Sequence, residues 1–245
     1  MLTSEAQFLV DDLTEIEWND AAFDHLVLPG NEKELAWAFV ENKALSTNHF
    51  DDFVQDKGRG IIILMFGPPG VGKTYTAEAV AERSRVPLYS MSAGMLGTTP
   101  KAVEAALDRA LELCKLWNAM LLLDEVDVFL GARTDTDLAR NELVAGFLDH
   151  AFQSRVDLFL PYADLTAQAR RKVWKNFIDR AGQDKFVVKD DDLDVLAGVS
   201  LNGREIKNLI KSAHLLSLKG KEKITMERLY MLAQNRLKAL QALSA

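Results

Sequence analysis

Short apolar runs alternate with amphipathic stretches through the middle of this chain. Residues 61–66 form a wholly apolar, isoleucine-rich run, as expected for a parallel strand that is buried on both faces. Similar runs lie at 87–91, 119–123 and 156–160, and helices are predicted at 73–85, after the Thr99-Pro100 pair and at 136–150. This alternation predicts a parallel sheet covered by helices.

After residue 165 the pattern predicts only helices, at 166–181, 191–197, 203–218 and 225–243. An all-helical tail behind an α/β core indicates a second, smaller domain. Before the core, acidic residues mix with apolar anchors up to the turn at Pro29-Gly30, and a helix follows from Asn31 to about Leu45. We therefore divide the chain into a lead-in segment that packs on the core (1–57), an α/β core (58–165) and a helical domain (166–245).

A glycine-rich motif directly follows the first apolar run. Residues 67–74 fit the pattern G-x-x-x-x-G-K-[ST] between a strand and a helix, which is typical of a phosphate-binding loop. Glycines let the backbone approach phosphates closely, and N–H groups at the positive end of the helix converge on them. Lys73 is expected to contact the β- and γ-phosphates and Thr74 to hold Mg²⁺. The predicted nucleotide-binding residues here are Gly67, Pro68, Pro69, Gly70, Val71, Gly72, Lys73, Thr74 and Tyr75. A simple Gly/Pro turn without a ligand is the alternative, which the combined spacing and context disfavour.

Two adjacent acidic residues end the apolar run at 119–123. Asp124 and Glu125 would lie at the carboxyl edge of the parallel sheet, where open α/β sheets bind their ligands. Asp124 is expected to complete the Mg²⁺ shell through its waters, and Glu125 to orient and deprotonate the attacking water. The pair predicts a hydrolase, the alternative being two solvated acids behind a strand.

The phosphate loop, the run LLLDEVDVF about fifty residues later and Gly203-Arg204-Glu205 together resemble the AAA+ ATPase family over residues 58–245. The lead-in around Trp18 and the segment RNELVAGFLDH resemble, more loosely, fungal AAA+ proteins of undefined biology. The resemblance implies a P-loop core with a helical lid, ATP and Mg²⁺ as cofactors, and a homo-oligomeric ring or larger AAA+ assembly that hydrolyses ATP between subunits. It also implies that Arg204 is the second sensor, which contacts the nucleotide from the lid, and that Arg155 is an arginine finger for a neighbouring subunit. An ordinary surface position is the alternative for both arginines.

Two features depart from the family pattern. The helix expected to end near His150 runs almost directly into Arg155, without room for the central strand that carries the first sensor. Loss of this strand would leave the runs 61–66 and 119–123 to pair with each other or to flank an unfilled slot. In addition, Met95-Leu96-Gly97 lacks the aromatic residue with which AAA+ translocases grip polypeptide, so polypeptide unfolding is not supported.

We therefore interpret the chain as a Mg-dependent ATP hydrolase in which nucleotide state is coupled to motion within an oligomer. Its catalytic residues would be Lys73, Glu125 and Arg155. The alternative is an ATP-binding module with little or no hydrolysis, because the first sensor is missing, that acts as an assembly or regulatory subunit. The biological substrate is not identified by any motif.

Charge is unevenly distributed along the chain. Residues 1–165 carry 13 Lys and Arg against 27 Asp and Glu, a balance of −14, whereas residues 166–245 carry 16 against 9, a balance of +7. The two surfaces are either separately solvated or meet between neighbouring subunits, and the acidic core disfavours binding to nucleic acid. There is no apolar run long enough for a membrane span, no secretory signal and only one cysteine, Cys114, so an intracellular location, cytoplasmic or nuclear, is expected.

Overall fold

Four strands form two separate parallel pairs in the computed structural model, which describes residues 14–45, 61–97, 99–125, 156–220 and 223–243. β1 (Ile63–Phe66) pairs with β4 (Leu158–Pro161), and β2 (Leu88–Ser92) pairs with β3 (Met120–Asp124). All four strands lie at or within one to two residues of the predicted runs, and both pairs are parallel as expected. Each pair is therefore a fragment of the parallel sheet that the strand–helix alternation predicts.

The relation between the two pairs corrects one expectation. Direct pairing of the runs 61–66 and 119–123 is wrong for the described strands, because β1 and β3 belong to different pairs. Their expected burial on both faces is also wrong: every residue of β3 is only half-buried, and Phe66 at the end of β1 is 48% exposed. Among the described residues each of these strands pairs on one side only, so less of the described structure covers its apolar side chains. The segment expected to lack a strand falls within 126–155, outside the described residues.

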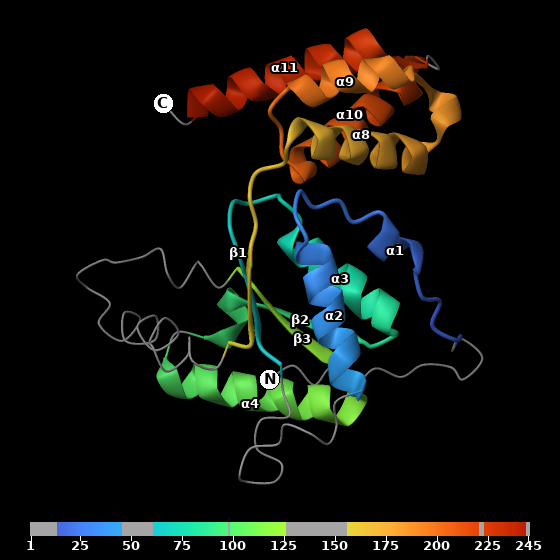
Figure 1. Ribbon diagram of the computed structural model, residues 1–245. Helices are drawn as coiled ribbons and strands as arrows, with labels where there is room; N and C mark the ends of the chain where they lie inside the picture. The colour runs from blue at the N-terminus through green and yellow to red at the C-terminus, as the bar shows by residue number, and fades with distance from the viewer. Residues whose placement is uncertain (1–13, 46–60, 98, 126–155, 221–222, 244–245) are drawn as a thin grey trace.

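Separate apolar cores form around the two strand pairs. β1 and β4 pack with α1 (Ala21–Asp24), α2 (Glu32–Leu45) and α3 (Lys73–Ser84) through a cluster that includes Phe23, Val80 and Leu160. β2 and β3 pack against the short 3₁₀ helix η2 (Ala93–Leu96) and α4 (Pro100–Trp117). Thr99 caps α4 as its sequence predicts, since its hydroxyl accepts a hydrogen bond from the Ala102 N–H. Figure 1 shows α2 and α3 beside β1 and α4 running past the other pair.

A cluster of aromatic rings and cations holds the lead-in segment on α3. The rings of Phe23 and Trp37 pack edge to face with centroids 5.7 Å apart. The Arg83 guanidinium of α3 lies over both rings, 4.3 Å and 4.5 Å from their centroids, and the Lys33 ammonium lies 4.6 Å from the Phe23 centroid. The segment that precedes the core thus contacts the helix that follows the glycine-rich loop.

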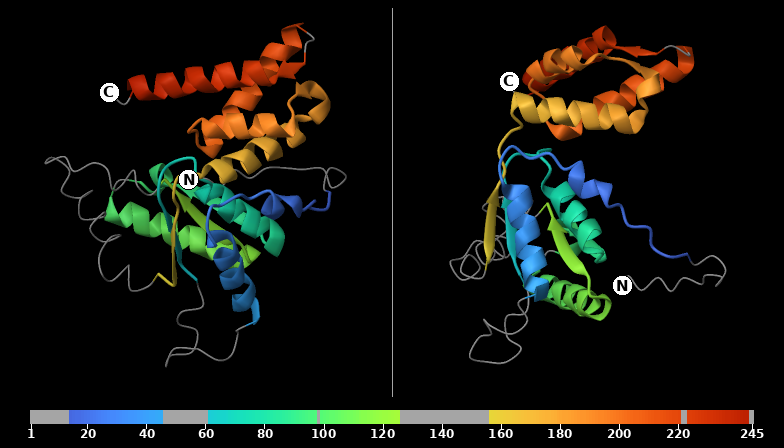
Figure 2. Two further views of the ribbon diagram at one scale, coloured as in Figure 1. Left: turned by 45° about the horizontal axis from the view of Figure 1, so that its top comes forward. Right: turned by 45° about the vertical axis from the view of Figure 1, so that its right-hand side comes forward.

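The C-terminal part of the chain is a helical layer on one side of the strands, and β4 leads directly into it (Figures 1 and 2). Its core buries Trp174, Leu196, Ile206, Ile224 and Leu229 almost completely. One detail corrects the expectation of helices alone: β5 and β6 are two-residue strands that pair in parallel. The elements of this layer are α8 (Ala167–Ala181), η3 (Gln183–Lys185), β5 (Phe186–Val187), α9 (Asp190–Gly198), α10 (Gly203–Gly220), β6 (Ile224–Thr225) and α11 (Met226–Leu243).

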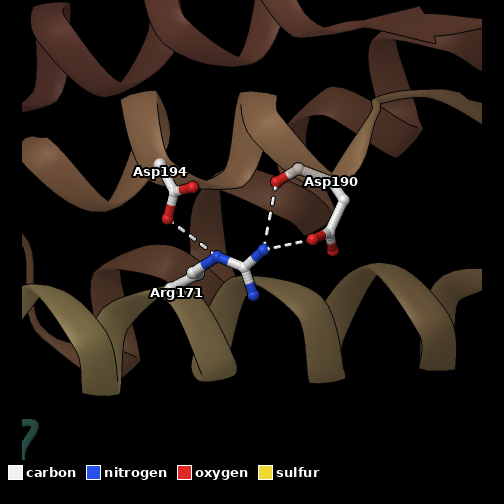
Figure 3. Close-up of polar contacts among 3 residues, drawn as sticks. All are labelled: Arg171, Asp190 and Asp194. Carbon is white, nitrogen blue, oxygen red and sulfur yellow. Dashed lines mark hydrogen bonds and ion pairs between the residues drawn. The ribbon is translucent and has the colours of Figure 1, made fainter.

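Two arginines of α8 connect this layer internally. Arg171 contacts the carboxylates of Asp190 and Asp194 on α9, with 2.8 Å between its Nε and Asp194 Oδ1 (Figure 3). Because both aspartates are exposed, these ion pairs orient α9 more than they stabilise the fold. Arg170 is more deeply placed, and donates hydrogen bonds to the carbonyls of Leu165, before α8, and Ala197, at the end of α9. No helix in the described part of the chain combines the length and hydropathy that a membrane span requires.

Candidate nucleotide-binding site

The glycines of the loop between β1 and α3 are required by its backbone. Gly67, Gly70 and Gly72 all have positive φ, at 137°, 76° and 107°. Space is also lacking at two of them: a Cβ on Gly67 would lie 2.1 Å from the Tyr162 carbonyl oxygen, and a Cβ on Gly70 would lie 2.5 Å from the Asn202 side chain. The motif therefore marks a loop whose conformation and close neighbours both exclude side chains.

Lys73 begins α3 and turns back over the loop. Its Nζ donates hydrogen bonds to the carbonyl oxygens of Gly67, at 2.8 Å, and Pro68, at 2.6 Å. Val71 in the same loop is buried in the core around β1, whereas Pro69 is exposed. The predicted loop residues thus divide into one that anchors the loop and others that leave its outer side accessible, with a positive charge held across it.

The two predicted magnesium ligands meet although they lie far apart in the sequence. The Thr74 hydroxyl, in the first turn of α3, donates to Asp124 Oδ2, at the end of β3, over 3.0 Å. A hydroxyl and a carboxylate supply the oxygen ligands that Mg²⁺ prefers, and Mg²⁺ is usually held by one or two carboxylates together with phosphates and waters. The described residues contain no group of three or more His, Cys, Asp or Glu that could hold a metal ion, so phosphate oxygens and waters would have to complete the ligands of an ion at this pair.

Glu125 leaves the strand with an unusual backbone. Its φ is 57°, in the left-handed region that residues other than glycine rarely adopt, and its N–H donates to Asp124 Oδ1 at 2.9 Å. The side chain is exposed at the carboxyl edge of β3, next to the Thr74–Asp124 pair. Strained positions of this kind are concentrated at functional sites.

The first turn of α10 lies against the loop. The Gly203 N–H donates to the Gly70 carbonyl oxygen at 3.0 Å. Asn202 caps the helix reciprocally with Glu205: Asn202 Oδ1 accepts from the Glu205 N–H at 3.0 Å, and Glu205 Oε2 accepts from the Asn202 N–H at 2.9 Å. Arg204, predicted from the resemblance to contact nucleotide, belongs to this first turn and is exposed.

Residues 25–28 form a further part of the site that the sequence did not reveal. A Cβ on Gly72 would lie 3.4 Å from a methyl carbon of Leu28, so this side chain borders the loop. Val27 packs on the core of the helical layer, and the Asn176 side chain of α8 donates to the His25 carbonyl oxygen at 3.0 Å. The apolar run Leu26-Val27-Leu28 before the Pro29-Gly30 turn could have marked this segment as buried, but nothing in its pattern indicates contact with the loop.

Two other predicted features have different outcomes. Arg155 lies outside the described residues, so its predicted role as an arginine finger stays a prediction. The triplet Met95-Leu96-Gly97 is not a free loop, since Leu96 is 1% exposed and packs in the core beneath α4. Tyr75, predicted to bind nucleotide through its backbone, uses its side chain to donate to the Ala22 carbonyl oxygen at 3.1 Å.

Comparison of sequences relates this chain to known ATPases. Residues 63–157 match the family model described as the ATPase family associated with various cellular activities (AAA). The ATP-dependent zinc metalloprotease FtsH 3 of Sphaerobacter thermophilus is 31% identical over 192 residues, which are 66% of this chain and 39% of that protein. The mitochondrial Lon protease homologue of Yarrowia lipolytica is 26% identical over 170 residues, 61% of this chain and 14% of that protein. The chain thus spans well under half the length of these curated relatives.

Comparison of structures confirms the predicted fold class, a P-loop α/β fold. The AAA domain of FIGL-1 in complex with ADP superposes with a TM-score of 0.54 and 16% identity, over 74% of this chain and 76% of that domain. A mutant RuvB of Thermotoga maritima superposes with a TM-score of 0.58 and 18% identity, over 86% of this chain and 71% of that one. Sequence identities this low support a similarity of fold and nothing further.

Proposed function

The chain carries a P-loop ATPase domain of the AAA+ family, and from this premise we propose that it binds Mg-ATP, hydrolyses it, and couples nucleotide state to motion within an oligomer. The observation that carries the proposal is the convergence of three segments on one edge. The loop after β1 with Thr74, the Asp124-Glu125 pair at the end of β3 and the first turn of α10 come from separate parts of the chain and lie together there.

The phosphate loop supplies the binding groups. We assign the backbone of residues 67–75 to the phosphates, with Lys73 on the β- and γ-phosphates, because the loop places its N–H groups at the start of α3. Phosphate oxygens would replace the carbonyls of Gly67 and Pro68 as partners of the Lys73 ammonium. Charge-assisted hydrogen bonds to phosphate are stronger than those to neutral carbonyls, which favours the exchange.

Magnesium fits the oxygen pair beside the loop. Thr74 would bind Mg²⁺ through its hydroxyl and Asp124 through its waters, and the bound ion would neutralise charge on the β- and γ-phosphates. Glu125 would accept a proton from the attacking water, because its carboxylate is exposed beside the same edge and its neighbour Asp124 is already engaged.

The proposed domains follow one another along the sequence. We propose a lead-in segment (1–57), a nucleotide-binding core (58–165) and a helical lid (166–245), with Arg204 presented to the nucleotide by the lid. AAA+ proteins are commonly oligomeric, and Arg155 would act on the ATP of a neighbouring subunit. The comparisons do not favour the alternative of a binding module that does not hydrolyse ATP.

Steady-state phosphate release tests the proposal of hydrolysis. The substitution Glu125→Gln removes the general base but keeps the shape of the side chain, so we expect turnover to fall by about 100-fold or more while Mg-ATP still binds. Glu112→Gln is the matched control, because Glu112 is an exposed carboxylate on α4 to which no role is assigned. Phosphate release by the wild type no faster than by Glu125→Gln would overturn the assignment of an ATP hydrolase.

A further inference from the structure

Tyr162 lies between the two ends of the phosphate loop. It directly follows β4 and is 5% exposed. Its N–H donates to the carbonyl oxygen of Phe66, the last residue of β1, at 2.8 Å, and its hydroxyl donates to Thr76 Oγ1, in the first turn of α3, at 2.9 Å. One residue is thus bonded to the strand that enters the loop and to the helix that leaves it.

On each side of the loop, Tyr162 is connected to a glycine. On the entry side, the Tyr162 carbonyl oxygen lies so close to Gly67 that no Cβ could be accommodated there. On the exit side, the fully buried Thr76 hydroxyl donates to the Gly72 carbonyl oxygen at 2.9 Å, and the Thr76 N–H donates to the same oxygen at 2.8 Å. The chain of contacts from Gly67 through Tyr162 and Thr76 to Gly72 therefore spans the base of the loop.

The described contacts give each hydroxyl of this network a partner. The Thr76 hydroxyl donates to the Gly72 carbonyl oxygen and accepts from the Tyr162 hydroxyl, which also lies 3.5 Å from Met65 Sδ. Burial raises the pKa of Tyr162 to about 12, so its phenol keeps its proton and remains a donor at every physiological pH. Buried polar networks in which every member is bonded hold their groups in a unique geometry.

We propose that Tyr162 is a positioning residue for nucleotide: acting through Thr76, its hydroxyl holds the two ends of the phosphate loop at the spacing that lets the loop N–H groups converge on the phosphates. This inference rests on the proposed function, because it concerns the affinity of the same loop for ATP. Tyr162 also begins the connection from β4 to α8, so the residue that supports the loop is the first residue of the path to the lid.

Calorimetric titration with Mg-ATP, together with thermal unfolding, tests the inference. Tyr162→Phe removes the hydroxyl, and Thr76→Val removes its partner at nearly constant volume. We expect each to weaken Mg-ATP binding about 3- to 10-fold, as for the loss of one hydrogen bond. The double variant should bind no more weakly than Thr76→Val alone, because both substitutions remove the same interaction.

Two controls separate positioning from stability. Thr76→Ser retains a hydroxyl, and should bind Mg-ATP within about twofold of the wild type, since the network can re-form. Ser84→Ala removes the equivalent hydrogen bond at the far end of α3, where Ser84 Oγ donates to the Val80 carbonyl oxygen at 2.7 Å. It should leave the affinity for Mg-ATP unchanged.

The outcomes distinguish this inference from the function beneath it. If Tyr162→Phe and Thr76→Val both bind Mg-ATP as tightly as the wild type, whatever their melting temperatures, Tyr162 has only a structural role. That result would overturn this inference and leave the proposed function standing. Equal loss of affinity in Ser84→Ala would do the same. If the wild-type chain bound no Mg-ATP, the proposed function would fail and this inference with it. Should Tyr162→Phe fold poorly, the comparison of Thr76→Val with Thr76→Ser gives the same answer.

Discussion

Single residues at the base of the phosphate loop are buried deeply enough to change their ionisation. Burial raises the pKa of Tyr162 to about 12. The same phenol in the unfolded chain ionises near pH 10. The folded chain therefore has the full benefit of the protonated phenol below pH 10, and that stability is lost as the pH rises through 10 towards 12.

A comparison of wild type with Tyr162→Phe isolates this ionisation, because phenylalanine cannot lose a proton. We expect the free energy of unfolding of the wild type to fall more steeply above pH 10, by about 1 kcal/mol relative to the variant at pH 11. Urea unfolding at pH 8, 10 and 11 measures both proteins under the same conditions. Parallel pH dependences would mean that Tyr162 is not buried as the structure places it.

The residues of the site differ in how far the sequence alone could identify them. Lys73, Thr74, Asp124 and Glu125 stand out in the sequence because the phosphate loop and the end of an apolar strand have fixed local spacings, and their roles with nucleotide stay predictions. Their meeting followed from the rule that ligands bind at the carboxyl edge of parallel strands, and the Thr74–Asp124 hydrogen bond agrees with it. Tyr162 was missed, because its role depends on contacts with residues nearly a hundred positions earlier in the chain.

Among the elements, long helices and apolar strands were predictable and their pairing was not. Periodicity over many residues marks α4, α8, α10 and α11, whereas β5 and β6 have two residues each, too few to show any period. The pairing of β1 with β4 and of β2 with β3 depends on contacts between distant segments. Strand order is therefore a property of tertiary packing that local pattern does not contain.

The cap of α10 connects an element's stability to the site. We expect Asn202→Ala to lower the free energy of unfolding by about 1 kcal/mol, as for other lost caps, and also to weaken Mg-ATP binding severalfold. The second effect is expected because Asn202 packs on Gly70 and its helix presents Arg204 beside the loop.

A matched cap in the same layer provides the control for Asn202→Ala. Thr166 caps α8, where its hydroxyl accepts from the Ala169 N–H at 3.1 Å, and no contact of Thr166 with the phosphate loop is among those described. Thr166→Ala should lower the free energy of unfolding, measured by chemical denaturation, by about as much as Asn202→Ala. It should leave the affinity for nucleotide unchanged. Equal affinities for the two alanine variants would remove Asn202 from the site.

At the scale of the whole molecule, the C-terminal helical layer rests on the loop and on residues 25–28. Gly203 contacts Gly70, Asn176 contacts His25, and Val27 packs into the core of the helical layer. Residues 166–245 carry the basic excess of the chain, and residues 1–165 are acidic. A nucleotide bound at this junction would touch both parts, so its binding should stabilise them together by mass action.

Titration of the purified chain with ATP, with and without Mg²⁺, tests the central claim most directly. We expect binding that requires Mg²⁺, raises the melting temperature, and is lost in Lys73→Ala but kept in Lys115→Ala, in which an exposed lysine of α4 is removed. At a free Mg-ATP concentration 100 times the dissociation constant, binding should stabilise the wild type by about 2.7 kcal/mol. Equal ATP affinity in wild type and Lys73→Ala, or no change when Mg²⁺ is removed with EDTA, would contradict the account.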